Sequence, residues 1–202
     1  NVAWYIVDSK VNMSVNATAK AGTFCAPFDV DVEDLPTGVE AYTVAHEDDN
    51  DYLTMTRITT KIPAGKPVIL RAPDIVEDVS KDFVGVYAAE PDDSGVLKGA
   101  YATTLIQSTE DVTRYLLQYQ AGNGGTAFYK VPKDGTRRSG ANRCYLELEA
   151  EEEDAPARIA LHGDDATAVS EIEAIEAKAG TMKDGKYLMK GRIVVVKDGK
   201  AY

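Results

Sequence analysis

The sequence predicts an all-β fold: an antiparallel, jelly-roll-like β-sandwich with a small β-meander at its C-terminal end. Short runs in which apolar and polar residues alternate recur along the chain, as they do in half-buried strands. Gly, Pro, Asn and Asp interrupt these runs about every dozen residues, a spacing that favours a sandwich over alternating βαβ units. Hydrophobic residues make up 44% of the 202 residues, which is enough for one sizeable core.

The strands predicted in the first half of the chain are separated by clear turn signals. Residues 11–17 alternate most regularly between apolar and polar side chains. The acidic segment 47–51 has the composition of a hairpin tip, because Asn and Asp tolerate turn conformations. It lies between the strand-like runs 39–44 and 52–58. Pro67 suits the first residue of the next strand, where its missing N–H matters least.

The second half contains an equally strong hairpin signal. The Gly-rich segment 121–125 lies between the strand-like runs 115–120 and 126–131. It lacks the Lys-Ser/Thr that follows in a phosphate-binding loop, so we interpret it as a turn. Further strands are predicted at 143–149 and 158–162.

The C-terminal part predicts a separate small element. Residues 168–179 are rich in helix formers, and Ser170 with Glu173 has capping-box spacing. A short helix and an extended linker both fit this segment. We therefore predict a sandwich over 1–163, a linker or short helix over 164–182, and a β-meander over 183–202. Because the sequence stops within the third strand of this meander, we expect that the natural chain continues or that its tail is disordered or trimmed.

Charge and hydropathy exclude two classes of partner. The formal net charge is -11, so the chain repels nucleic-acid phosphates and anionic membrane surfaces. The longest apolar run, 193–196, is far shorter than the roughly 20 residues that a membrane-spanning helix needs. We expect neither nucleic-acid binding nor membrane insertion.

The two cysteines, Cys25 and Cys144, both lie in strand-like runs. Their number fixes neither compartment nor pairing, so two buried thiols and one disulfide both remain open. A catalytic thiol is disfavoured, because the two histidines lie in unrelated contexts.

An ordered series of short motifs resembles a known type of domain. The series comprises residues 21–28, 38–44, 52–54, 62–70, 97–99, 125–129, 141–146, and the tail 185–202. It is similar to the accessory β-domain found near the C-termini of secreted and cell-surface proteins of Bacteroidetes such as Prevotella. The resemblance implies an extracytoplasmic location and attachment to a larger protein, and it supplies no catalytic residues.

Motifs for catalysis and for metals are weak. Neither a G-x-S-x-G nor an H-E-x-x-H motif occurs, and His46 and His162 have no second His or Cys within a few residues. We therefore predict no catalytic residues and no cofactor. If a calcium site exists, the best candidates are Asp48, Asp49 and Asp51, whose carboxylates could converge in a tight turn.

Aromatic side chains suggest a binding role. Sandwich domains often hold sugars on exposed aromatic rings, which offer flat apolar faces with polar edges. Trp4 and the strand pair Tyr115 and Tyr119 are the candidates, with the two tyrosines four residues apart on one face of a strand. The sequence thus predicts a non-catalytic accessory or interaction module of a secreted or surface-anchored bacterial protein. The alternative is a carbohydrate-binding module, and the expected partners are a glycan or other domains of the parent protein.

Overall fold

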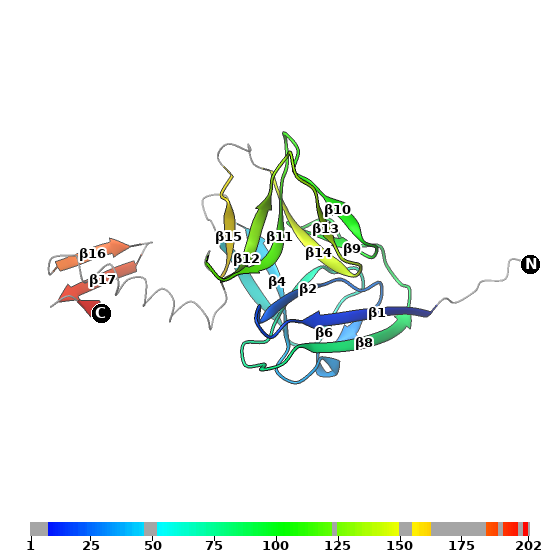
Figure 1. The fold of residues 1–202 in the computed structure, drawn as a ribbon. Helices are drawn as coiled ribbons and strands as arrows, with labels where there is room; N and C mark the ends of the chain where they lie inside the picture. The colour runs from blue at the N-terminus through cyan, green and yellow to red at the C-terminus, as the bar shows by residue number, and fades with distance from the viewer. Residues whose placement is uncertain are drawn as a thin grey trace, which may run out of the picture. The chain divides into compact units, whose positions relative to one another are not determined.

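The computed structural model describes residues 8–46, 52–122, 125–149, 155–162, 185–189, 192–197 and 200–201 (Figure 1). Within these ranges every regular element is a strand except one 3-10 turn, η1 (Val32–Asp34). The all-β prediction is confirmed. The segment 168–179, predicted as a short helix or linker, lies outside the described residues. The chain divides into two compact units, Asn1–Leu161 and His162–Tyr202.

A nine-stranded sheet forms the body of the first unit. Every strand pair whose register is defined in the described residues is antiparallel, as predicted. The strand order is β2 (Ala21–Phe24), β7 (Val68–Arg71), β4 (Glu40–His46), β5 (Tyr52–Ile58), β15 (Arg158–His162), β12 (Gly125–Val131), β11 (Thr113–Gln120), β14 (Arg143–Leu148) and β9 (Leu97–Ala100).

Both predicted hairpins are confirmed. Strands β4 and β5 pair with Val44 opposite Met55, on either side of the acidic segment. Strands β11 and β12 pair with Tyr119 opposite Thr126, on either side of the Gly-rich segment. The two histidines lie at strand ends, since β4 ends at His46 and β15 ends at His162.

The large sheet curls until its first strand meets its eighth. The N–H of Cys25, just after β2, donates to the carbonyl of Asn142, just before β14, at 3.0 Å. The amide of Asn142 donates back to the carbonyl of Cys25 at 3.4 Å. Asn142 has φ of 56°, a left-handed conformation that Asn tolerates better than most residues. The Cys144 N–H donates to the Thr23 hydroxyl at 3.3 Å. The sheet is therefore nearly closed, and we call this contact between residues 23–25 and 142–144 the seam.

The inside of the curled sheet is filled by a core that includes large aromatic side chains. Tyr115 and Phe128 are fully buried there and pack among aliphatic side chains from strands on every side. This interior core consists of Tyr42, Leu53, Met55, Ile69, Leu97, Tyr115, Phe128, Cys144, Leu146, Leu148 and Ile159.

A second core lies on the outer face of β2, β7 and β4. The antiparallel ribbon of β1 (Asp8–Val15) and β8 (Val79–Val86) contributes Val11, Met13, Val15 and Phe83 to it. The short pair β3 (Val30–Asp31) and β6 (Lys61–Ile62) also contributes. Strand β7 is covered on both faces, which explains why its sequence is continuously apolar rather than alternating.

A small third layer covers the other side of the sheet. Strands β10 (Thr104–Ile106) and β13 (Arg137–Ser139) pair with each other. Ile106 packs with Leu116 and Val131 from the outer faces of β11 and β12. The layers of this β-fold are thus two-stranded sheets that pack against the outside of the nearly closed nine-stranded sheet.

The second unit contains the predicted β-meander. Strands β16 (Gly185–Met189), β17 (Arg192–Lys197) and β18 (Lys200–Ala201) form an antiparallel sheet in chain order. Leu188 pairs with Ile193, and Lys197 pairs with Lys200 across the Asp-Gly dipeptide. In the part of the chain that is described, no helix has the length and apolar character needed to cross a membrane.

The seam requires a residue without a side chain at Gly99. A Cβ atom added there would lie 2.6 Å from the Cys25 sulfur and 3.0 Å from Pro91. We expect Gly99→Ala to lower the free energy of unfolding by about 1–3 kcal/mol, because the packed neighbours cannot move freely. Urea unfolding followed by fluorescence measures the change. Gly95→Ala is the matched control, since nothing lies within 4 Å of its added Cβ. Equal stability of the two variants would contradict tight packing at the seam.

Candidate functional site

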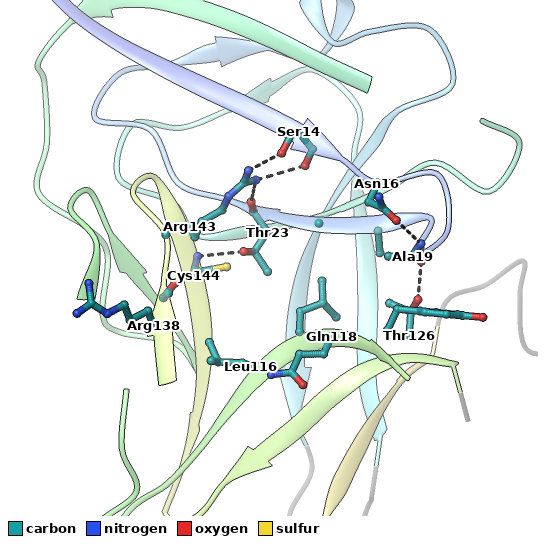
Figure 2. A pocket seen from close by; sticks show the side chains of 16 residues that line it. Ser14, Asn16, Ala19, Thr23, Leu116, Gln118, Thr126, Arg138, Arg143 and Cys144 are labelled. Atoms are coloured by element: carbon teal, nitrogen blue, oxygen red, sulfur yellow. Dashed lines mark hydrogen bonds between the residues drawn. The ribbon is translucent and has the colours of Figure 1, made fainter. Parts of the chain in front are cut away.

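An open cavity of about 480 Å³ lies beside the seam (Figure 2). Three segments that are distant in sequence form it: the β1–β2 turn, the β11–β12 hairpin and the β13–β14 turn. It is lined by Ser14, Asn16, Ala19, Ala21, Gly22, Thr23, Leu116, Leu117, Gln118, Tyr119, Thr126, Arg138, Ser139, Gly140, Arg143 and Cys144.

The β1–β2 turn forms one wall and is held in shape by Asn16. The Asn16 side-chain oxygen accepts the N–H groups of Thr18 and Ala19, at 2.9 and 3.0 Å, in an Asx-type turn. Its side-chain nitrogen donates to Asp78 at 3.0 Å. The Thr126 hydroxyl donates to the Ala19 carbonyl at 2.5 Å, which ties this turn to β12 (Figure 2). The wall is therefore fixed from both sides before any ligand binds.

Arg143 forms the opposite wall. Its Nη1 donates to the carbonyls of Thr23 and Ser14, at 2.8 and 3.3 Å, and its Nη2 donates to the Ser14 hydroxyl at 2.5 Å (Figure 2). The guanidinium thus donates to backbone carbonyls of both β1 and β2. One side chain joins three strands here.

The charge of Arg143 has no carboxylate partner within the described residues. Arg57 and Arg114, in contrast, form ion pairs with Glu40 and Glu147, at 2.6 and 2.7 Å. Burial lowers the pKa of Arg143 below its usual range, because desolvation disfavours the charged form. The guanidinium still stays protonated, because arginine is not deprotonated in proteins.

The two thiols lie in the seam, and both are free. Of the two alternatives left open by the sequence, the structure has buried thiols. Burial is the main reason that the pKa of each thiol rises to about 12. The Cys25 thiol donates to the Gly65 carbonyl at 3.4 Å, and the Cys144 thiol to the Val68 carbonyl at 3.5 Å. Both sulfurs are therefore protonated packing groups rather than nucleophiles.

The lining can bind polar groups and offers little for proton transfer. Its side chains supply hydroxyl, amide and guanidinium groups, and among the lining residues that the structure describes none is Asp, Glu or His. General acid–base catalysis usually relies on one of those three residue types. The cavity is suited to holding a polar ligand through several hydrogen bonds.

The structure separates the two tyrosines that the sequence paired. Tyr119 is 45% exposed and lines the cavity. Tyr115 is fully buried in the interior core, so the prediction that its ring meets a ligand is wrong. Both face the same side of β11, but Tyr115 sits in mid-sheet opposite Leu146, whereas Tyr119 is near the hairpin end. The position of each tyrosine along β11, rather than the face of the strand it lies on, therefore decides whether its ring is buried or exposed.

The other predicted site residues lie outside the described residues. These are the aromatic candidate Trp4 and the calcium candidates Asp48, Asp49 and Asp51. Within the described ranges, no group of three or more His, Cys, Asp or Glu side chains could hold a metal ion.

Other tyrosines do not contribute to the cavity. Tyr87 and Tyr101 pack edge to face, with ring centroids 6.0 Å apart, and Tyr101 donates to the Ala89 carbonyl at 2.7 Å. Tyr129 is buried, and its hydroxyl donates to the Gly125 carbonyl at 2.8 Å.

Sequence reasoning missed the residues that shape the site. Arg143, Asn16 and Thr126 belong to no catalytic or ligand-binding motif. They act across large separations, since Arg143 and Ser14 are 129 positions apart and Thr126 and Ala19 are 107 positions apart. Only a fold that brings these segments together reveals them.

Comparisons with protein-family models, with curated proteins and with solved structures find no match for this chain.

The state of the thiols is directly testable. We expect neither cysteine of the folded protein to react with a maleimide at mildly alkaline pH, because both are buried and both remain protonated below a pKa of about 12. In guanidinium chloride both should react, giving two adducts by mass spectrometry. Rapid labelling of the folded protein would contradict the buried, packed role of the seam thiols.

Proposed function

We propose that this chain is a non-catalytic accessory module of a larger secreted or cell-surface bacterial protein, and that the cavity beside the seam is its ligand site. The resemblance to accessory domains of Bacteroidetes surface proteins supports the location and the attachment. The observation that carries the binding role is the cavity lining, whose described residues are rich in hydrogen-bonding side chains and include no Asp, Glu or His.

The lining favours a saccharide as the ligand. Sugar rings present hydroxyl groups on their edges and apolar C–H faces above and below the ring. The Gln118 amide can exchange hydrogen bonds with hydroxyls, the Thr126 oxygen can accept one, and Tyr119 offers a half-exposed ring for stacking. This combination of one aromatic surface and several neutral polar groups is the usual composition of a small-molecule pocket with directional contacts.

The cavity is also preformed, which lowers the cost of binding. Its two walls are held by the Asn16, Thr126 and Arg143 hydrogen bonds without any ligand. A rigid site loses little conformational entropy when it binds, so modest contacts give measurable affinity. The proposed role is therefore to retain the parent protein on a glycan.

The test is a panel of plant, host and bacterial polysaccharides with a matched pair of variants. We expect retention of the wild type on at least one saccharide and a Kd about three- to tenfold higher for Tyr119→Ala, because an aromatic contact is lost. Affinity electrophoresis and titration calorimetry measure both effects. Tyr87→Ala is the control, since Tyr87 is 44% exposed and does not line the cavity.

Two results would overturn the proposal. The first is a wild-type protein that no saccharide in the panel retains, which would leave a module that only spaces or anchors its parent. The second is equal loss of affinity in Tyr119→Ala and Tyr87→Ala, which would place the binding elsewhere.

A further inference from the structure

The cavity differs in charge from the rest of the molecule. Asp and Glu account for 33 of the 202 residues, yet none of the 16 residues that line the cavity is acidic. Two of the lining residues are arginines, Arg138 and Arg143. A cationic hollow on an acidic protein concentrates anionic ligands locally, because field lines focus in a low-dielectric recess.

Arg143 retains unused hydrogen-bonding capacity. A guanidinium has five N–H donors, and the contacts to Ser14 and Thr23 use both hydrogens of Nη1 and one of Nη2. Nη1 donates to the Ser14 carbonyl and Nη2 donates to the Ser14 hydroxyl, so the guanidinium edge between these two nitrogens is occupied. Among the described residues no acceptor meets the Nε–H. The side edge, formed by Nε–H and the second Nη2 hydrogen, is the edge that binds a carboxylate through two parallel bonds.

A partly buried guanidinium without a counter-ion is costly in free energy. At Arg114 this cost is met by an acidic neighbour, Glu147, at 2.7 Å. At Arg143 the neighbours are carbonyls and a hydroxyl, which solvate the cation without neutralising it. An anionic group from a ligand would complete this environment.

Arg138 adds positive charge at the rim of the cavity. It is exposed, and it forms no ion pair within the described part of the chain. In Figure 2 its guanidinium extends away from Arg143. Its contribution is therefore long-range attraction of an approaching anion rather than a fixed contact.

We infer that the ligand of this cavity is an acidic saccharide whose oxyanion binds the free edge of the Arg143 guanidinium, with its ring held by Tyr119 and Gln118. This inference rests on the proposed function, because it names the ligand chemistry of the same site. The oxyanion is either a carboxylate or a sulfate, and the experiment separates these two sources.

The first experiment compares three ligands on the wild-type protein by titration calorimetry. They are an oligogalacturonate, a neutral oligogalactoside of equal length and a sulfated oligogalactoside. We expect at least one acidic ligand to bind about tenfold or more tightly than the neutral one, with affinity falling as salt rises, because a charge-assisted pair is formed. A preference for the galacturonate identifies a carboxylate, and a preference for the sulfated ligand identifies a sulfate.

The outcomes of this comparison are distinguishable. Equal affinity for the neutral and acidic ligands overturns the inference and leaves the proposed function standing. Binding of none of the three, together with a negative saccharide panel, overturns the proposed function and the inference with it.

A charge-inserting variant tests the location without disturbing the seam. Gln118→Glu is isosteric and places a carboxylate in the cavity lining. We expect it to raise the Kd for the acidic ligand about fivefold more than the Kd for the neutral ligand, because both ligands lose the amide contact but only the acidic ligand is repelled by the new carboxylate. Thr54→Glu is the control, since it adds the same charge to an exposed position of β5 outside the cavity.

Arg143→Lys tests the guanidinium itself. The lysine keeps the charge and loses the two-pronged edge, so we expect about a tenfold weaker affinity for the acidic ligand in a protein that still unfolds cooperatively. If Arg143→Lys does not fold, the Gln118→Glu variant alone tests whether the oxyanion binds in this cavity. An unchanged Kd in Gln118→Glu, or an equal loss for neutral and acidic ligands, overturns the assignment of the oxyanion to this cavity.

Discussion

The contact between Arg143 and the β1–β2 segment is the interaction on which the rest of the first unit depends. It joins residues that are 120 positions apart, through the Thr23 carbonyl at 2.8 Å, and draws the eighth strand of the large sheet against its first. A long, multivalent donor such as arginine can reach carbonyls of two strands at once, and here it links β14 to β1 and β2 where the curled sheet nearly closes around the interior core.

The seam also explains why a polar cavity exists at this place. The small outer sheets cover the large sheet with apolar side chains on either side of it. Between those layers the seam is closed by one backbone hydrogen bond, from Cys25 to Asn142, and by hydrogen bonds of the Thr23, Asn142 and Arg143 side chains. Two of these residues, Thr23 and Arg143, also line the cavity. Arg143 therefore serves both the closure of the sheet and the proposed ligand recognition.

Sequence periodicity predicted which face of a strand each side chain lies on, but not whether that side chain is buried in the core. Tyr115 and Tyr119 occupy one face of β11, as their spacing indicated. Only the sheet register shows that the first lies opposite Leu146 in the core and the second beside the hairpin. In the same way, the apolar run of β7 predicted a strand, whereas its burial on both faces depends on the β1–β8 ribbon that packs over it.

The sequence by itself determined the antiparallel all-β class, the β4–β5 and β11–β12 hairpins and the C-terminal β-meander. These features follow from alternation and turn chemistry, which act over a few residues. Only the tertiary structure decided the closure of the sheet, the free state of Cys25 and Cys144, and the site built from Asn16, Thr126 and Arg143. Those features depend on contacts between segments more than a hundred residues apart, and no local pattern encodes which segments meet.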